Sequence, residues 1–169
     1  MKTLLSIALV AVAGWWYFVG GRKLSEDHVD QFYRSVEIAT LERKPQALCD
    51  LLAPEFTSSG TVSIAGRRET QAQTHDKAQT CESYRKLYET WEQLGEKMGG
   101  TLQLDSQYKL NSIAVSADHK TATVDISTSL DVAGSIMNIR SRSTDTLVRR
   151  NGKLLLLHSE GTGSVTGGS

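Results

Sequence analysis

The chain has 169 residues, and its 19 lysines and arginines balance its 19 aspartates and glutamates, so the formal net charge is zero. A chain of this length has room for one ordinary domain with a single core. Proteins that bind nucleic acid carry a basic excess, because neutralising phosphates supplies most of their affinity. The even balance of charge therefore argues against nucleic acid as a partner.

The stretch from residue 3 to residue 21 carries no charge and is flanked by basic residues. A cleaved signal peptide is one interpretation, because a basic start, an apolar run and the small residues at 11–13 are all present. Cleavage would leave the aromatic residues at 15–18 exposed, whereas an uncleaved anchor would place their rings at the headgroup level of a bilayer. The sequence predicts residues 1–23 as a transmembrane signal anchor, with secretion after cleavage as the alternative.

A segment this close to the start exports the rest of the chain by default, so the domain is expected outside the cytosol, on the periplasmic side in a bacterium. Cys49 and Cys81 are the two cysteines of the chain. In an exported domain such a pair is a candidate disulfide. Two buried free thiols are the alternative, because cysteine packs like a small hydrophobic residue.

Helical periodicity dominates the first half of the exported part. Ser25 is a suitable N-cap, and apolar residues follow it at helical spacing until shortly before Pro45, which ends the helix. Pro45 itself suits the start of a second, short helix over residues 46–52. The strongest helix is expected over residues 74–98, where apolar and aromatic residues recur every three or four positions and Gly99-Gly100 follow.

Alternation of apolar and polar residues predicts strands in the remainder of the chain. A segment rich in serine, threonine and glycine before the long helix predicts a short strand or hairpin. A four-strand meander follows the long helix, with a parity switch near residues 111–112 that indicates a bulge and a tight turn at Asn151-Gly152. The expected domain covers residues 24–162, and residues 163–169 are expected to form a flexible tail. The expected strands are 56–68, 102–115, 122–132, 136–149 and 153–162.

This order of elements over residues 25–162 resembles that of the nuclear transport factor 2-like superfamily, which includes ketosteroid isomerases and polyketide cyclases. The junction Leu-Leu-Ala-Pro-Glu-Phe at 51–56 and the ending Asn-Gly-Lys-Leu-Leu-Leu-Leu-His at 151–158 are its most similar segments. Two positions depart from the family's pattern: Leu154 stands where the family usually has tryptophan, and Glu160 occupies a frequent second polar position, two residues after His158. The resemblance implies an α+β fold in which a curved antiparallel sheet wraps the long helix to form a cone.

The wide end of such a cone would be a ligand pocket between the helices and the inner face of the sheet. Aromatic residues on the helices and on one strand are expected to line it, although core packing is the commoner role of such residues. Sequence alone separates these two roles poorly. The predicted pocket residues are Tyr33, Tyr84, Tyr88, Trp91 and Tyr108.

Asp145, His158 and Glu160 are the candidate catalytic residues on the last two strands. By parity, His158 and Glu160 are expected to share a face with Leu154 and Leu156. A desolvated carboxylate acts as a base and a tyrosine stabilises a nearby oxyanion, which is the arrangement that the resemblance to ketosteroid isomerases implies. The alternative is that all three lie at the rim or in solvent. A metal site would need a third ligand beside His158 and Glu160, and neither a metal nor a cofactor is expected.

The sequence therefore favours a non-enzymatic binding or interaction module of the cell envelope, anchored through residues 3–21 and binding a protein or a small apolar ligand. One alternative is an isomerase, cyclase or dehydratase that acts on a small hydrophobic substrate in the cone. Another is a structural subunit of an envelope machine. A homodimer through the open sheet face is also considered, since outward strand residues such as Arg140 and Arg142 suit either a wet interface or solvent.

Overall fold

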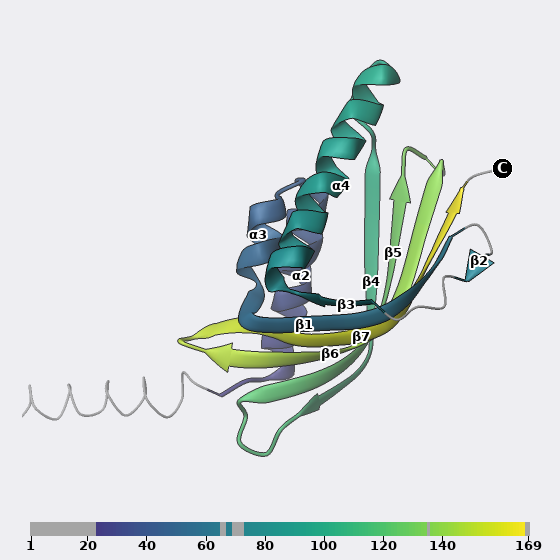
Figure 1. Ribbon diagram of the computed structural model, residues 1–169. Helices are drawn as coiled ribbons and strands as arrows, with labels where there is room; N and C mark the ends of the chain where they lie inside the picture. Colours follow the sequence, from purple (N-terminus) through teal and green to yellow (C-terminus); the bar gives the residue numbers. More distant parts are fainter. Residues whose placement is uncertain (1–22, 65–66, 69–72, 135, 168–169) are drawn as a thin grey trace, which may run out of the picture.

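The computed structural model describes residues 23–64, 67–68, 73–134 and 136–167. Three helices, α2 (Glu26–Leu41), α3 (Pro45–Asp50) and α4 (Lys77–Lys97), lie on one side of a curved sheet (Figure 1). The mixed α+β architecture expected from the sequence is therefore confirmed.

The helix boundaries follow from local chemistry. Ser25 precedes α2 as expected, and Pro45 is the first residue of α3, where its missing N–H leaves no bond unmade. Asp76 caps α4: its carboxylate accepts the Gln79 N–H at 2.9 Å, while its own N–H donates to the Gln79 side chain at 3.1 Å. The long helix therefore begins at Lys77 rather than near residue 74, because the residues just before Asp76 pair as a strand.

One seven-stranded sheet contains every strand of the described residues, in the order β2-β1-β7-β6-β5-β4, with β3 also paired to β1. The β1–β7 pair is parallel and the other pairs are antiparallel, so the sheet is mixed and not wholly antiparallel as the sequence predicted. The last four strands in the sequence form the expected meander. The strand bounds are β1 (Leu52–Ile64), β2 (Arg67–Arg68), β3 (Gln73–Asp76), β4 (Leu104–Val115), β5 (Thr121–Val132), β6 (Met137–Arg150) and β7 (Lys153–Gly167).

Two bulges shift the register of the meander. The first lies in β4 between Leu110 and Ser112, as the parity switch in the sequence predicts. The second separates the pair Leu147–Leu156 from the pair Thr146–His158, so that β7 carries one extra residue, Leu157. An extra residue on one strand turns every following side chain of that strand to the opposite face.

The flexible tail expected at residues 163–169 is wrong for residues 163–167, which belong to β7, and residues 168–169 lie outside the described ranges. Ser164 pairs with Arg140 of β6 and with Ser63 of β1, and the hydrogen-bond ladders on both sides hold the strand in place. Asn151 and Gly152 both have positive φ, at 50° and 78°, as a tight hairpin turn between β6 and β7 requires.

The core forms two clusters on the helix side of the sheet. The first joins α2 to the first half of β5 and the end of β6. The second joins the end of α2, α3 and α4 to the start of β4 and the end of β5. The buried residues of the first are Leu24, Val29, Phe32, Tyr33, Ala122, Val124, Ile126 and Leu147. Those of the second are Ala39, Leu48, Tyr88, Trp91, Leu102 and Val132.

A disulfide between Cys49 of α3 and Cys81 of α4 confirms the pairing that the sequence suggested, with a Cα–Cα distance of 5.5 Å. It fastens the start of the long helix to the short one. Among the described residues, no helix is long and apolar enough to cross a bilayer. The predicted anchor at residues 3–21 lies outside the described ranges.

Candidate functional site

Asp145 is the centre of the candidate site. It is the buried charged residue of the described chain, with 5% of its surface exposed, and it lies on β6 opposite the fully buried Val124 of β5. Its Oδ2 accepts a hydrogen bond from the Tyr33 hydroxyl at 2.8 Å, and its Oδ1 accepts one from the Ser159 hydroxyl at 2.7 Å. A buried carboxylate needs such partners, because leaving its charge unpaired would be costly. The two hydroxyls therefore hold Asp145 in a fixed orientation inside the cone.

Each partner of Asp145 is positioned by its own element. Tyr33 lies on the buried stripe of α2 beside Phe32, whose ring meets the Tyr33 ring edge-on at 5.2 Å. Ser159 reaches Asp145 because the bulge at Leu157 turns it to the inner face of β7. Sequence reasoning missed Ser159, since four consecutive leucines precede His158 and offer no alternation from which a register shift could be seen.

The same bulge overturns the expected positions of two candidates. His158 and Glu160 do not share a face with Leu154 and Leu156, because the extra residue turns them outward. The His158 ring nitrogen lies 2.9 Å from the Thr57 hydroxyl of β1, and Glu160 is exposed. Of the three candidate catalytic residues, Asp145 alone points into the cone.

The surroundings of Asp145 raise the pKa of two tyrosines. Burial, followed by the negative charge of Asp145 and the hydrogen bond to it, raises the pKa of Tyr33 far above its ordinary value. Burial and then the neighbouring Tyr88 and Asp145 raise the pKa of Tyr84 to about 12. Both hydroxyls thus remain protonated at neutral pH. Tyr33 serves Asp145 as a hydrogen-bond donor.

A pocket of about 300 Å³ lies over the inner face of β1, β6 and β7, and we call it the serine pocket. By strand register, its hydroxyl-bearing residues Ser58, Ser143 and Ser159 face the same side as Asp145. His75 of β3 pairs with Ser58 and also lines this pocket. The sequence predicted residue 75 at the start of the long helix, because the edge strand β3 is too short to leave a pattern. The lining residues used here are Ser58, Gly60, His75, Ser143, Ser159 and Gly161.

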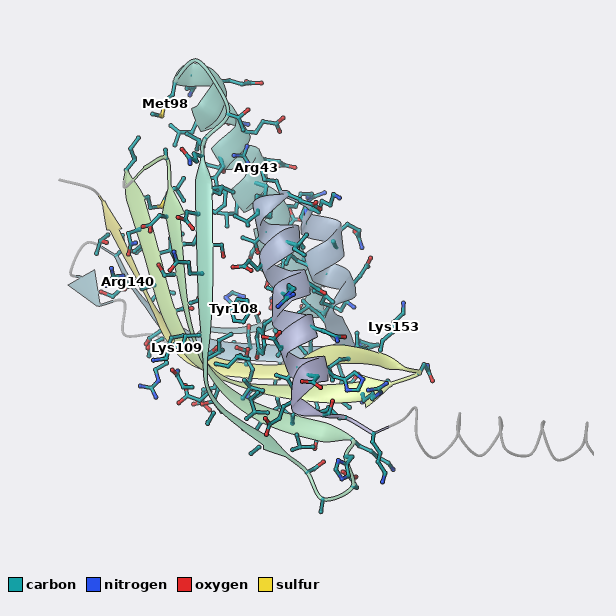
Figure 2. All side chains as sticks on the ribbon, turned by 180° about the vertical axis from the view of Figure 1, so that it is seen from behind. Arg43, Met98, Tyr108, Lys109, Arg140 and Lys153 are labelled. Carbon is teal, nitrogen blue, oxygen red and sulfur yellow. A yellow bond between two sulfur atoms is a disulfide. The ribbon has the colours of Figure 1, made fainter. Side chains whose placement is uncertain are left out.

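A second hollow of about 200 Å³, the tyrosine pocket, lies between α2 and the strands β4 to β6. Tyr33 and Tyr108 line it, with ring centroids 6.0 Å apart. The Tyr108 hydroxyl donates to Asp30 of α2 at 3.1 Å. Figure 2 shows Tyr108 on the helix side of β4, with Lys109 and Arg140 on the opposite face of the sheet. Tyr33 is therefore shared between Asp145 and this hollow.

The other predicted pocket residues lie elsewhere. Tyr88 and Trp91 are 8% and 2% exposed and belong to the second core cluster, against which Tyr84 also packs. Tyr88 and Trp91 also border a charged groove of about 610 Å³ beside α4, together with Arg43 and Arg85. The aromatic residues thus divide between the tyrosine pocket and the core. No cluster of three metal-ligating side chains occurs within the part of the chain that the structure describes.

The arrangement supports hydrogen bonding more directly than it supports proton transfer. Both carboxylate oxygens of Asp145 are occupied by the protein's own hydroxyls, and little of the residue reaches solvent. A ligand in the serine pocket would meet Ser159 first and would reach the carboxylate only if that hydroxyl turned away. Ser159 is therefore the link between the pocket and the buried charge.

Solved structures of known proteins share this architecture. A nuclear transport factor 2-like protein of unknown function from Silicibacter pomeroyi is 11% identical, with a TM-score of 0.53 over 80% of this chain and 92% of that chain. A candidate scytalone dehydratase from Novosphingobium aromaticivorans is 11% identical, with a TM-score of 0.57 over 85% of this chain and 87% of that chain. A candidate dehydratase from Streptomyces avermitilis is 14% identical, with a TM-score of 0.53 over 80% and 93%.

The chain matches no family model and no curated protein. TM-scores of 0.53 to 0.57 indicate a common fold, while identities of 11% to 14% leave the activity open. The expectation drawn from element order is nevertheless met: a curved sheet with the long helix on its concave side. The described part of this chain has the fold of the nuclear transport factor 2-like superfamily.

Proposed function

We propose that the domain is a non-enzymatic module of the cell envelope that binds a small polar molecule in the serine pocket. The observation that carries this proposal is the lining of that pocket, in which Ser58, Ser143 and Ser159 face the same side as His75. Such a surface offers several hydroxyl donors and acceptors, set among apolar area from residues such as Val62 and the glycines. A molecule with several hydroxyl, carbonyl or carboxylate groups would pair with these hydroxyls, whereas the purely apolar ligand expected from sequence would leave them without partners.

Binding without turnover is favoured by the state of Asp145. A general base must reach the proton that it removes, and this carboxylate is closed off by Tyr33 and Ser159. In a binding module the same contacts have a simpler role, because they fix the Ser159 hydroxyl at the edge of the pocket. The pocket would then be preorganised for hydrogen bonding.

Attachment to the membrane through residues 3–21, with the domain outside the cytosol, is part of the proposal. The disulfide between Cys49 and Cys81 supports it, because such bridges form and persist in oxidising compartments. The test is thiol trapping in intact cells that make the full chain. A bridged protein accessible to protease added outside the inner membrane is expected. Reduced cysteines in a protected protein would contradict export.

Binding is tested by native mass spectrometry of the full chain released gently from its own membranes. We expect an added mass that leaves on activation. Ser58→Leu fills the pocket and should abolish the added mass. Thr123→Leu, on the outer face of β5, is the matched control and should retain the added mass. A bare wild-type protein that no polar metabolite stabilises against heat would contradict the proposal.

A second candidate function is proton-transfer chemistry of the isomerase or dehydratase type. The 2.8 Å hydrogen bond between Tyr33 and Asp145 favours it, since a desolvated carboxylate beside a neutral tyrosine is a usable acid–base pair. Ser159 would have to rotate to admit a substrate. A bound molecule that is released unchanged by wild type and by Asp145→Asn alike would exclude this candidate, while chemical conversion by wild type alone would establish it.

A further inference from the structure

One end of the domain receives the chain from the N-terminal segment, and we call it the N-terminal pole. It consists of Lys23 and Leu24, the β4–β5 turn at 117–120 and the β6–β7 turn at 150–153. Leu24 is 1% exposed and belongs to the first core cluster. The second described residue is thus already part of the core.

Hydrogen bonds hold this start of the chain from two sides. The Leu24 N–H donates to the His119 carbonyl at 2.9 Å, and the His119 ring nitrogen lies 3.2 Å from the Leu24 carbonyl oxygen. The Arg149 side chain donates to the Lys23 carbonyl at 3.2 Å, and its backbone N–H donates to the Lys120 carbonyl at 2.8 Å. Lys23 and Leu24 are therefore built into the pole rather than loosely attached to it.

The distance from the pole to the uncharged segment is short. Only Arg22 and Lys23 separate Gly21, where that segment ends, from the buried Leu24. The three Cα–Cα steps from Gly21 to Leu24 span at most about 11 Å, even when the chain is fully extended. If the uncharged segment crosses a bilayer up to Gly21, this short connection keeps the pole close to the lipid headgroups.

The opposite end of the domain lies far from the pole. β5 has 12 residues and runs from Thr121 at the pole to Val132 at the far end, roughly 40 Å along the strand. Figure 2 shows Lys153 at the hairpin tip of the pole and Met98 at the remote end of α4. Ser159 lies six residues beyond Lys153 on β7, so the serine pocket is displaced from the pole by roughly 20 Å.

We propose that the N-terminal pole rests on the headgroup layer of the membrane, and that the remote end of α4 and the serine pocket are held away from it. The inference rests on the proposed anchor. Exposed Lys23, Lys120 and Lys153 meet lipid phosphates at this surface. Two carboxylates at the same end already have partners within the protein. Glu55 forms an ion pair with Arg150, and Asp118 accepts a hydrogen bond from the Ser116 hydroxyl.

Glu26 and Asp27 begin α2 beside the pole, so its overall charge is close to even and does not select acidic lipids. The contact is instead imposed by the short connection to the anchor. This orientation determines the route of the ligand. The ligand reaches the serine pocket from the aqueous compartment and not by lateral transfer from the bilayer.

The test uses the full chain in vesicles of phosphatidylcholine and phosphatidylglycerol that carry a headgroup-attached fluorescence quencher. Ala117→Cys places a label in the β4–β5 turn, and Lys97→Cys places one at the remote end of α4; both positions are exposed, and both native cysteines are bridged. An alkaline carbonate wash first measures whether the chain stays in the vesicles. We expect it to stay, the label at 117 to lose most of its fluorescence and the label at 97 to keep most of it.

The outcomes separate the two proposals. A chain that stays in the vesicles but whose two labels are quenched equally, or in the reverse order, would overturn the orientation and leave the anchor standing. A chain removed by the wash would overturn the anchor and the orientation with it. Asn151→Cys in the β6–β7 turn repeats the measurement if the variant at 117 fails to fold, and it is expected to be quenched like the label at 117.

Discussion

The Tyr33 hydroxyl of α2 donates a 2.8 Å hydrogen bond to the Asp145 carboxylate of β6, 112 residues later in the chain. This contact joins the first helix to the centre of the sheet. It also accounts for half of the hydrogen bonds that the carboxylate receives in the described structure, the other coming from Ser159. Among the described residues, Asp145 is the buried charged residue in a core made mainly of hydrophobic side chains.

Tyr33→Phe removes the hydroxyl and keeps the ring. Hydrogen bonds to a charged group contribute about 1.5–3 kcal/mol, so we expect the free energy of unfolding to fall by that amount. Urea denaturation followed by circular dichroism measures it. Tyr108→Phe is the matched control: its hydroxyl bonds to Asp30 at 3.1 Å at a less buried position, and a loss below about 1 kcal/mol is expected. Equal losses in the two variants would show that Asp145 does not depend on Tyr33.

Ser159→Ala leaves Oδ1 of Asp145 without its partner and opens the carboxylate to the serine pocket. An unsatisfied buried acceptor costs about 1–3 kcal/mol, which the same denaturation experiment should reveal. Ser143→Ala also enlarges the pocket, but Ser143 does not bond to Asp145, and this control is expected to change the stability by less than about 0.5 kcal/mol. A Ser159 variant as stable as the Ser143 variant would mean that water replaces the missing hydroxyl.

The two bulges show which parts of this site a sequence can reveal. In β4 apolar and polar residues alternate, so the shift near Ser112 appears as a change of parity and is correctly predicted. In β7 the leucines at 154–157 hide the shift, and the faces of His158 and Ser159 are therefore exchanged. Asp145 was found because its strand keeps register with β5 throughout. Contacts such as Tyr33 to Asp145 depend on how a helix is docked, which local periodicity does not encode.

Alkaline pH should expose the buried tyrosines. Burial raises the pKa of Tyr33, and the pKa of Tyr84 rises to about 12, whereas both have ordinary values near 10 when unfolded. The folded state therefore binds more protons than the unfolded state above pH 10, and stability falls as the pH rises from about 10 to 12. In a pH titration, the tyrosinate absorbance of the folded protein should rise at a higher pH than that of the urea-unfolded chain. The rise should coincide with unfolding. Ionisation of all tyrosines near pH 10 in the folded protein would contradict the buried network.

Reduction of the disulfide should weaken the attachment of α4. The bridge closes a loop between Cys49 and Cys81, positions separated by 32 residues, and such a loop stabilises by about 3–4 kcal/mol in the chain-entropy model. Unfolding in urea with and without a thiol reductant measures the difference. The double variant Cys49→Ala and Cys81→Ala is the control, because it should have the stability of the reduced protein and should not respond to reductant. If the reductant does not change the free energy of unfolding of the wild-type protein, packing alone keeps α4 in place.

Gly161 is required by the close approach of β6 and β7 under the serine pocket. A Cβ at this position would lie 2.4 Å from the Arg142 carbonyl oxygen and 2.7 Å from the Ser143 Cβ, distances that only a backbone shift could relieve. Gly161→Ala should therefore destabilise the domain by about 1–3 kcal/mol and distort the pocket.

Gly163→Ala is the matched control, two residues further along the same strand, because the nearest atom to its Cβ would be 3.9 Å away. That variant should be as stable as wild type within about 0.5 kcal/mol, since no contact forces the backbone to move. If the two alanine variants unfold at the same urea concentration, β6 and β7 can move apart at Gly161 without a loss of stability. The strands beneath the serine pocket would then be less rigid than these contacts indicate. If only Gly161→Ala is destabilised, a rigid glycine contact shapes the pocket that we propose as the binding site.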